Sequence, residues 1–307
     1  MKIAITGIGG VGGYFGGLLA KQYFNSEIEI FFIARGAHEK ATREKGLVMN
    51  TMNGNFIVHP KNISSDASTI GVVDLILCCT KGYDLEEAML SVKACIGNNT
   101  VLLPLLNGVD AKERLQKIYP GNEIWDGCVY LVARRTAPGV ISETGNIRKL
   151  FFGAEEGTKE KLQSTEKIFQ DAGIDATWSK NIKETIWEKY LFISPMATVT
   201  SFLDKTIGEV FSNKKSEELL NQLVAEIKSV AGANGISLPG NVTTSNIEKL
   251  KSLPPEATTS MHSDFRRGGR TELESLTGYV IRLAASKGIP VPTYEIMYEM
   301  LRQKSSE

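Results

Sequence analysis

A cluster of glycines directly after the first apolar run constrains this chain more than any other feature. The chain opens MKIAITGIGGVGGYFGGLLAKQ, in which a buried-strand pattern ends at Gly7 and a helical pattern continues from Val11. Glycine weakens both helices and strands, so the cluster indicates either a flexible loop or backbone that must approach another group closely. A flexible loop does not explain why the strand and helix patterns abut the glycines so tightly. The pattern therefore favours close approach by a ligand.

Gly7, Gly9 and Gly12 fit the spacing G-x-G-x-x-G between a strand and a helix. In this setting the first glycine permits a tight turn, the second lets a pyrophosphate reach the backbone, and the third lets the helix pack on the strand. Unpaired N–H groups at the helix N-terminus attract phosphate. The segment predicts a dinucleotide-binding loop whose cofactor contacts are Gly7, Ile8, Gly9, Gly10, Val11 and Gly12.

The end of the second strand pattern indicates which dinucleotide is bound. Sites specific for NAD usually carry an acidic residue there, which accepts a hydrogen bond from the ribose 2′-hydroxyl. This strand ends FFIARG and has no carboxylate, but it has Arg35. The planar, permanently charged guanidinium suits a 2′-phosphate, so we predict NADP (NADPH) as the cofactor. A surface arginine at a strand end is the alternative.

The composition argues against several kinds of partner. Lysine plus arginine and aspartate plus glutamate number 35 each among 307 residues, so the net charge is near zero. This balance disfavours binding to nucleic acid or to a membrane surface. The four cysteines lack CxxC or Cys/His ligand spacing and are expected to be buried reduced thiols rather than metal ligands. With no transmembrane or signal-peptide pattern, we expect a cytoplasmic protein.

Strand and helix patterns alternate in the N-terminal part. The apolar runs there predict strands covered on both faces, as in a parallel sheet. Several short strands are expected over residues 126–153, followed by a helix over 158–173 and a strand near 175–179. From about residue 181 almost everything is helical. We therefore predict an α/β fold, with an N-terminal Rossmann-type doubly wound sheet that binds NADP (1–179) and a C-terminal all-helical domain for substrate and catalysis (180–307).

Three polar residues stand where chemistry could occur. Lys81 and Asn107 follow consecutive predicted strands, and ligands of doubly wound sheets bind beyond the carboxyl ends of strands. Either residue alone would be an ordinary loop residue. Lys189 lies at i+7 from Ile182 on the apolar face of a predicted helix. It either extends its ammonium to water, which periodicity alone favours, or is desolvated and becomes a better proton donor.

The segment TTSMHSDFRRGGRTELESL offers further candidates. Ser260 and Asp264 stand at i and i+4 on one predicted helix. Thr271 is expected to cap the next helix, and Glu272 to lie in its first turn beside the positive end of the helix dipole. On local pattern alone these are cap and surface residues.

Together these motifs resemble the ketopantoate reductases (2-dehydropantoate 2-reductases), NADPH-dependent enzymes of the wider 6-phosphogluconate-dehydrogenase-like group. The resemblance covers essentially the whole chain. It rests on GIGGVGG, Arg35, TKGYD with Lys81, LLNGVD with Asn107, GVISETG, IWEKYLF with Lys189, and TTSMHSDFRRGGRTELESLTGYVIRLAASKGIPVPT. The last stretch is the most specific, because its serine, aspartate and glutamate keep the family's spacing.

The resemblance implies hydride transfer from NADPH to the keto carbon of 2-dehydropantoate, giving pantoate for pantothenate and coenzyme A synthesis. It implies that Lys189 is the general acid, and that Glu272 is a catalytic carboxylate that contacts substrate and cofactor and helps keep Lys189 protonated. The remaining implied contacts are Lys81, Asn107, Ser260 and Asp264 for the substrate, and Lys81, Asn107 and Ala133 for the cofactor.

One departure from the family bears on the substrate. Many members carry asparagines four and eight residues after the catalytic lysine, where this chain has Ile193 and Ala197, unless Ser194-Pro195 shifts the register. Each lost donor weakens recognition of a hydroxylated substrate by about 0.5–1.5 kcal/mol. A paralogous reductase of another 2-keto acid, a non-catalytic NADP(H)-sensing protein and an NAD-dependent dehydrogenase are the alternatives. The expected partner is a small 2-keto acid, and a homodimer is left open.

Overall fold

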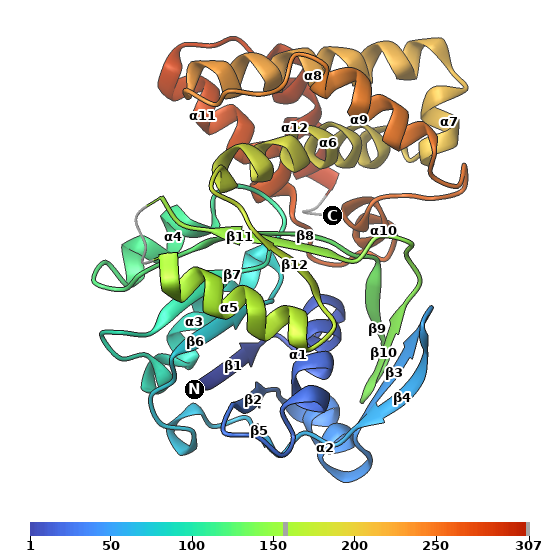
Figure 1. The fold of residues 1–307 in the computed structure, drawn as a ribbon. Helices are drawn as coiled ribbons and strands as arrows, with labels where there is room; N and C mark the ends of the chain where they lie inside the picture. The colour runs from blue at the N-terminus through green and yellow to red at the C-terminus, as the bar shows by residue number, and fades with distance from the viewer. Residues whose placement is uncertain (156–158, 305–307) are drawn as a thin grey trace. The chain divides into compact units, whose positions relative to one another are not determined.

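The computed structural model describes residues 1–155 and 159–304, and the chain divides into two compact units (Figure 1). The first comprises Met1–Leu106 with Ala111–Ile182, and the second comprises Asn107–Asp110 with Lys183–Glu307. The division at 179/180 inferred from the sequence did not include the short segment Asn107–Asp110 in the second unit. Each unit is described by itself below.

The first unit is built on a parallel sheet of five strands in the order β5-β2-β1-β6-β7. Every neighbouring pair in this sheet is parallel. The strands are β1 (Lys2–Thr6), β2 (Glu29–Ile33), β5 (Asn62–Ser64), β6 (Leu75–Cys78) and β7 (Val101–Pro104). The predicted Rossmann-type sheet is confirmed.

Both faces of this sheet are covered, as the continuous apolar runs predicted. Successive side chains of a strand point to opposite faces. Ile3 and Ile5 of β1 pack in one buried cluster with Phe15 of α1 (Gly10–Gln22), whereas Ala4 packs in another with Met89 of α3 (Leu85–Ser91). The sheet is therefore doubly wound.

Two smaller sheets complete the first unit, with strand orders β4-β3-β10-β9 and β12-β11-β8. The short strands expected over 126–153 are confirmed, whereas α2, β3 and β4 had no sequence prediction. Thr158, where the predicted helix 158–173 begins, lies outside the described residues, and α5 starts at Lys159. The remaining elements of this unit are α2 (Gly36–Lys45), β3 (Leu47–Thr51), β4 (Gly54–Val58), α4 (Ala111–Ile118), β8 (Asp126–Tyr130), β9 (Ala133–Ala137), β10 (Val140–Glu143), β11 (Lys149–Gly153), α5 (Lys159–Asp171) and β12 (Asp175–Trp178).

The second unit is helical, as predicted. Its longest helix is α6 (Ile182–Leu203), which begins at the last residue of the first unit and continues through Pro195. The other helices are α7 (Ile207–Phe211), α8 (Lys214–Ala233), α9 (Val242–Lys251), α10 (Ser260–Arg266), a π-helical turn (Glu274–Gly278), α11 (Tyr279–Lys287) and α12 (Pro292–Lys304). No helix in the described part of the chain combines the length and apolar character needed to cross a membrane.

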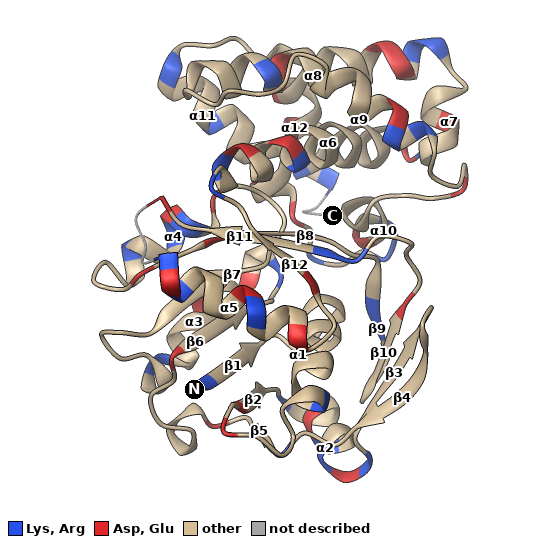
Figure 2. Ribbon diagram, in the orientation of Figure 1, with Lys and Arg blue, Asp and Glu red and all other residues tan. Residues whose placement is uncertain are grey.

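Charged residues of both signs are interspersed over the helices of each unit (Figure 2). On α8, for example, Lys214 and Lys215 are followed within one turn by Glu217 and Glu218. This interspersion agrees with the balanced composition of the chain.

Candidate functional site

Two glycines of the first loop are required by the packing of the protein itself. Gly7 has a φ of +83°, and a Cβ there would stand 2.7 Å from the backbone of Cys79 and Thr80. A Cβ on Gly12 would stand 2.4 Å from the Gly7 carbonyl oxygen. The first glycine thus permits the turn after β1, and the third lets α1 pack closely on that turn.

Gly9 differs, because no heavy atom of the described residues outside its chain neighbours lies within 4 Å of a Cβ built there. Gly9 stands at the N-cap of α1, and no described side chain caps this helix end. Its first backbone N–H groups can therefore bind an anion, and the missing Cβ leaves room for it. The loop fits the pyrophosphate of a dinucleotide.

The start of β9 lies against the same loop. A Cβ on Gly10 would stand 2.1 Å from the carbonyl oxygen of Ala133, so the Ala133 backbone lies directly beside the first turn of α1. Among the other predicted contacts in the loop, Ile8 is buried and Val11 is half-buried against the core. The loop and the Ala133 backbone are thus neighbours within the first unit.

Arg35 stands at the N-cap of α2, directly after the buried residues at the end of β2. Its side chain is 58% exposed, and its guanidinium lies 3.9 Å from the exposed carboxylate of Glu87. Exposed ion pairs of this kind contribute little free energy, so Arg35 remains available to an anion.

His38, in the first turn of α2, has a lowered pKa because it is buried and because the charge of Arg135 is nearby. The His38 imidazole is therefore neutral at pH 7. The positive charges in this part of the structure come from Arg35 and Arg135.

Lys81 and Asn107 follow neighbouring parallel strands, as predicted. β6 and β7 pair in register, and each polar residue lies three positions beyond its strand. Lys81 is half-buried at the N-cap of a short 3-10 helix, Gly82–Asp84. Asn107 belongs to the second unit.

A chain of hydrogen bonds joins three of the predicted residues in the second unit. The Lys189 ammonium donates to Oδ1 of Asn107 at 3.0 Å, and Nδ2 of Asn107 donates to Oε2 of Glu272 at 3.3 Å. An ammonium can only donate and a carboxylate can only accept, so the Asn107 amide has one sensible orientation between them. Lys189 is 8% exposed and Glu272 is 3% exposed.

The burial of Lys189 decides between the two interpretations of its helix face. Ile182 and Ile186 on the same face are also buried, and the ammonium donates to a protein amide. The lysine therefore does not extend to bulk water. The helix runs unbroken past Pro195, so Ile193 and Ala197 do stand four and eight residues after Lys189. Ile193 is half-buried, and Ala197 is buried in the core of the unit.

Glu272 does not lie where the local pattern put it. The next helix begins at Leu273 rather than after a Thr271 cap, so Glu272 precedes the first turn, and its carbonyl accepts from the Leu276 N–H. The expected Thr271 cap was wrong, because the helix begins only at Leu273 and then enters a π-helical turn at Glu274, which the amino-acid pattern does not predict.

Asn107 is held by a short, tightly packed segment. Gly108 has a φ of +99°, and a Cβ there would stand 3.0 Å from Asp110 and 3.3 Å from Ser275. The Ser275 hydroxyl lies 3.4 Å from Oδ2 of Asp110. Asp110 is buried, so this segment packs on the π-helical turn that follows Glu272.

Ser260 and Asp264 do share a helix, as predicted. Ser260 is exposed at the first position of α10, and Asp264 is half-buried. The cap of this helix is Thr259, whose side chain accepts from the His262 N–H. The structure thus assigns both residues to α10, whereas Lys189, Asn107 and Glu272 form the hydrogen-bonded chain.

A row of hydroxyl groups on α6 was not predicted from the sequence. Tyr190, Ser194 and Thr198 recur every four residues, are fully buried, and bond to the turn that follows Glu272. Their spacing of four residues in an otherwise apolar helix could have predicted this row, because it places all three hydroxyl groups on one helix face.

Neither a metal site nor a reactive thiol is found in the described residues. No group of three or more His, Cys, Asp or Glu side chains among them could hold a metal ion. All four cysteines are buried, and desolvation raises the pKa of the Cys78 and Cys79 thiols. Such thiols stay protonated and unreactive.

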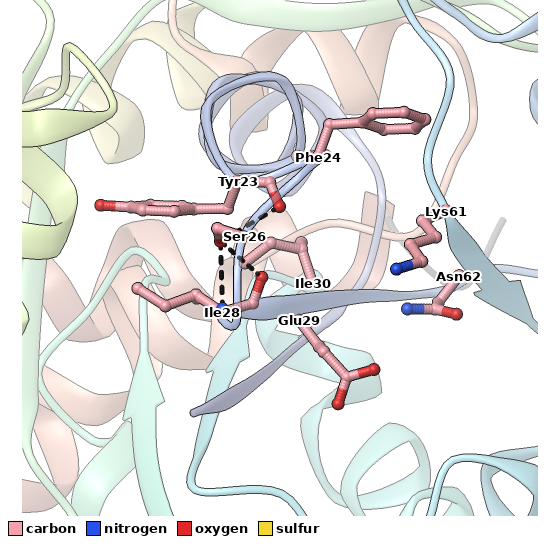
Figure 3. A pocket seen from close by; sticks show the side chains of 9 residues that line it. Tyr23, Phe24, Ser26, Ile28, Glu29, Ile30, Lys61 and Asn62 are labelled. Atoms are coloured by element: carbon pink, nitrogen blue, oxygen red, sulfur yellow. Dashed lines mark hydrogen bonds between the residues drawn. The ribbon is translucent and has the colours of Figure 1, made fainter.

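A small hollow in the first unit lies apart from these residues. It is lined by Ala20, Tyr23, Phe24, Ser26, Ile28, Glu29, Ile30, Lys61 and Asn62 (Figure 3). Figure 3 shows the Ser26 hydroxyl turned to its own loop, where it donates to the Tyr23 or Ile28 carbonyl and accepts from the Ile28 N–H. None of the predicted site residues lines the hollow.

Comparisons with known proteins agree with this architecture. A model of the family described as ketopantoate reductase PanE/ApbA matches residues 3–157, and the model of its C-terminal part matches residues 181–305. A 2-dehydropantoate 2-reductase of Halobacterium salinarum is 27% identical over 98% of both chains. An uncharacterized oxidoreductase, YkpB of Bacillus subtilis, is 26% identical over the full length of both.

Solved structures give the same result. A 2-dehydropantoate 2-reductase of Porphyromonas gingivalis is 34% identical with a TM-score of 0.85, and the match covers 98% of this chain and 99% of that one. A PanE/ApbA family ketopantoate reductase of Ralstonia eutropha is 27% identical with a TM-score of 0.90, covering 100% and 99%. The chain therefore belongs to the ketopantoate reductase family of oxidoreductases.

Proposed function

We propose that this protein reduces a 2-keto acid with NADPH, and that 2-dehydropantoate is its substrate and pantoate its product. The observation that carries the proposal is the buried chain from Lys189 through Asn107 to Glu272. Membership of the family and the names of relatives such as the Halobacterium salinarum enzyme support the choice of substrate.

Reduction of a ketone to an alcohol requires a hydride at carbon and a proton at oxygen. When bound, the reduced nicotinamide supplies the hydride. Lys189 donates the proton to the developing alkoxide, and its ammonium stabilises the negative charge on that oxygen before transfer. This stabilisation is strong because the ammonium is largely removed from water.

Asn107 and Glu272 orient the proton donor. The Asn107 carbonyl oxygen accepts one ammonium hydrogen and so fixes the direction in which the Lys189 side chain extends. Glu272 accepts from the amide nitrogen and thereby prevents the amide from flipping.

The residues proposed to hold the phosphates of the dinucleotide lie in the first unit. The backbone N–H groups at the start of α1 bind the pyrophosphate over Gly9, and Arg35 binds the 2′-phosphate. Lys81 and Ala133 are proposed contacts for the nicotinamide half. Ser260 and Asp264 of α10 are proposed contacts for the substrate.

A second candidate substrate class follows from α6. Ile193 and Ala197 stand one and two turns beyond Lys189, and neither side chain can donate a hydrogen bond. A 2-keto acid with an apolar side chain is therefore the alternative substrate.

The test is NADPH oxidation, followed by absorbance, with 2-dehydropantoate and a panel of hydroxylated, branched and aromatic 2-keto acids. We expect the highest kcat/KM with 2-dehydropantoate. A clear preference for an apolar acid would select the alternative, and tight NADPH binding without turnover of any acid would indicate a sensing protein.

The cofactor preference is tested by Arg35→Ala. Loss of a charge-assisted hydrogen bond to the 2′-phosphate should weaken NADPH binding by about 1.5–3 kcal/mol, which is roughly 10- to 150-fold in Kd. NADH lacks this phosphate, so its Kd should change little. Lys40→Ala removes an exposed charge from the same helix, α2, and serves as the matched control. Equal losses for NADPH and NADH in Arg35→Ala would contradict the assignment.

A further inference from the structure

A π-helical turn lies two residues after Glu272. It spans Glu274–Gly278, and the Tyr279 N–H donates to the Glu274 carbonyl, five residues back rather than four. Such turns are rare, because they widen the helix and weaken its packing, and they occur frequently at functional sites. One that persists in a buried segment needs compensating contacts.

Hydroxyl groups of α6 supply these contacts. The Tyr190 hydroxyl lies 2.8 Å from the Ser275 carbonyl and 3.2 Å from that of Leu276. The Ser194 hydroxyl donates to the Leu276 carbonyl at 2.6 Å. The phenol of Tyr190 remains a donor because burial raises its pKa, with the Tyr294 phenol and the Asp110 carboxylate adding to the effect.

The same turn is tied to the segment that carries Asn107. The side chain of Ser275 reaches Asp110, while its backbone carbonyl accepts from Tyr190. The turn is thus bonded to α6 on one side and to Asn107–Asp110 on the other. These are the two elements that present the Lys189 ammonium and the Asn107 amide to Glu272.

We propose that Tyr190 and Ser194 are positioning residues of the reductase site, which hold the π-helical turn so that Glu272 and Asn107 stay aligned with Lys189. Neither hydroxyl acts on the substrate. Tyr190 follows Lys189 directly in α6, so its bond to Ser275 ties the helix that carries the proton donor to the turn that follows the carboxylate. The inference rests on the proposed function for its activity readout.

The test variant is Tyr190→Phe, which removes one hydroxyl and keeps the ring. Small displacements of catalytic groups are costly, so we expect kcat to fall on the order of ten-fold while the Kd of NADPH stays unchanged. The matched control is Tyr119→Phe, which removes a buried hydroxyl that donates to the Met89 carbonyl at 2.7 Å in the first unit, away from the turn. This control should keep kcat within about two-fold.

A double-mutant cycle separates positioning from general stability. In the Glu272→Gln background, where the carboxylate is already lost, Tyr190→Phe should lower kcat by less than about two-fold. Additive losses would overturn the proposal. Should Tyr190→Phe fail to fold, Ser194→Ala provides the same cycle and the same expected outcome.

A crystal structure of Tyr190→Phe gives a readout that does not depend on activity. The hydrogen bond from Asn107 Nδ2 to Glu272 Oε2 should be lengthened or broken, and finding it intact would overturn the positioning role. If the wild-type protein turned over no 2-keto acid, the proposed function would fail, while this comparison would still decide the role of Tyr190.

Discussion

Replacing Lys189 with methionine should lower kcat by about 10²- to 10⁴-fold, the range that general acid catalysis typically contributes. Methionine keeps much of the apolar stem that packs in the core but cannot donate a proton. Steady-state kinetics with NADPH and the preferred 2-keto acid measure the loss. The Kd of NADPH, measured by fluorescence titration, should stay the same, because the proposed phosphate contacts of the cofactor lie in the first unit.

Lys183→Met is the matched control for this variant. Lys183 lies on the same helix but is exposed, so its replacement should leave kcat unchanged. A Lys189→Met protein that retained more than about a tenth of the wild-type kcat would show that another group supplies the proton.

Gly9→Ala should weaken NADPH binding by about ten-fold or more, equivalent to at least 1.4 kcal/mol, with only a small loss of stability. The new methyl group meets no heavy atom of the described residues beyond the chain neighbours, so only the poorer capping of α1 by alanine should lower the free energy of unfolding, by about 1 kcal/mol or less. The methyl would, however, occupy the space through which a pyrophosphate reaches the backbone. Isothermal titration with NADPH and a urea unfolding curve measure the two quantities.

Gly12→Ala serves as the comparison, because it should mainly lower the stability of the protein rather than act directly on NADPH binding. Its Cβ would stand 2.4 Å from the Gly7 carbonyl oxygen, so this variant should lose stability before any ligand is added. If Gly9→Ala bound NADPH as tightly as the wild type, the loop would not be the pyrophosphate site.

Local sequence rules predicted the parts of the fold that depend on neighbouring residues. The apolar run, the glycines and the apolar helix face at the N-terminus predicted a strand, a turn and a helix. The structure has all three, with a positive φ at Gly7 in the turn. The continuous apolar strands implied a sheet covered on both sides, and the clusters around Ile3 and Ala4 show why.

Features set by tertiary contacts could not be predicted in this way. Periodicity placed Lys189 on the buried face, but that its ammonium stays inside rather than reaching water depends on tertiary contacts such as the hydrogen bond to the Asn107 amide. Ser194-Pro195 left the register after Lys189 open in the sequence, and the structure shows that α6 continues through Pro195 to Leu203. The π-helical turn after Glu272 depends on hydroxyl groups more than 80 residues away in sequence.

The assignment of Asn107–Asp110 to the helical unit affects any attempt to divide or recombine this protein. A fragment that starts at residue 183 would contain Lys189 and Glu272 without the amide that links them. A chimera of two relatives joined near residue 180 would take that amide from one parent and the lysine from the other. Swapping halves near residue 180 would therefore assemble this hydrogen-bonded chain from the residues of two different parents.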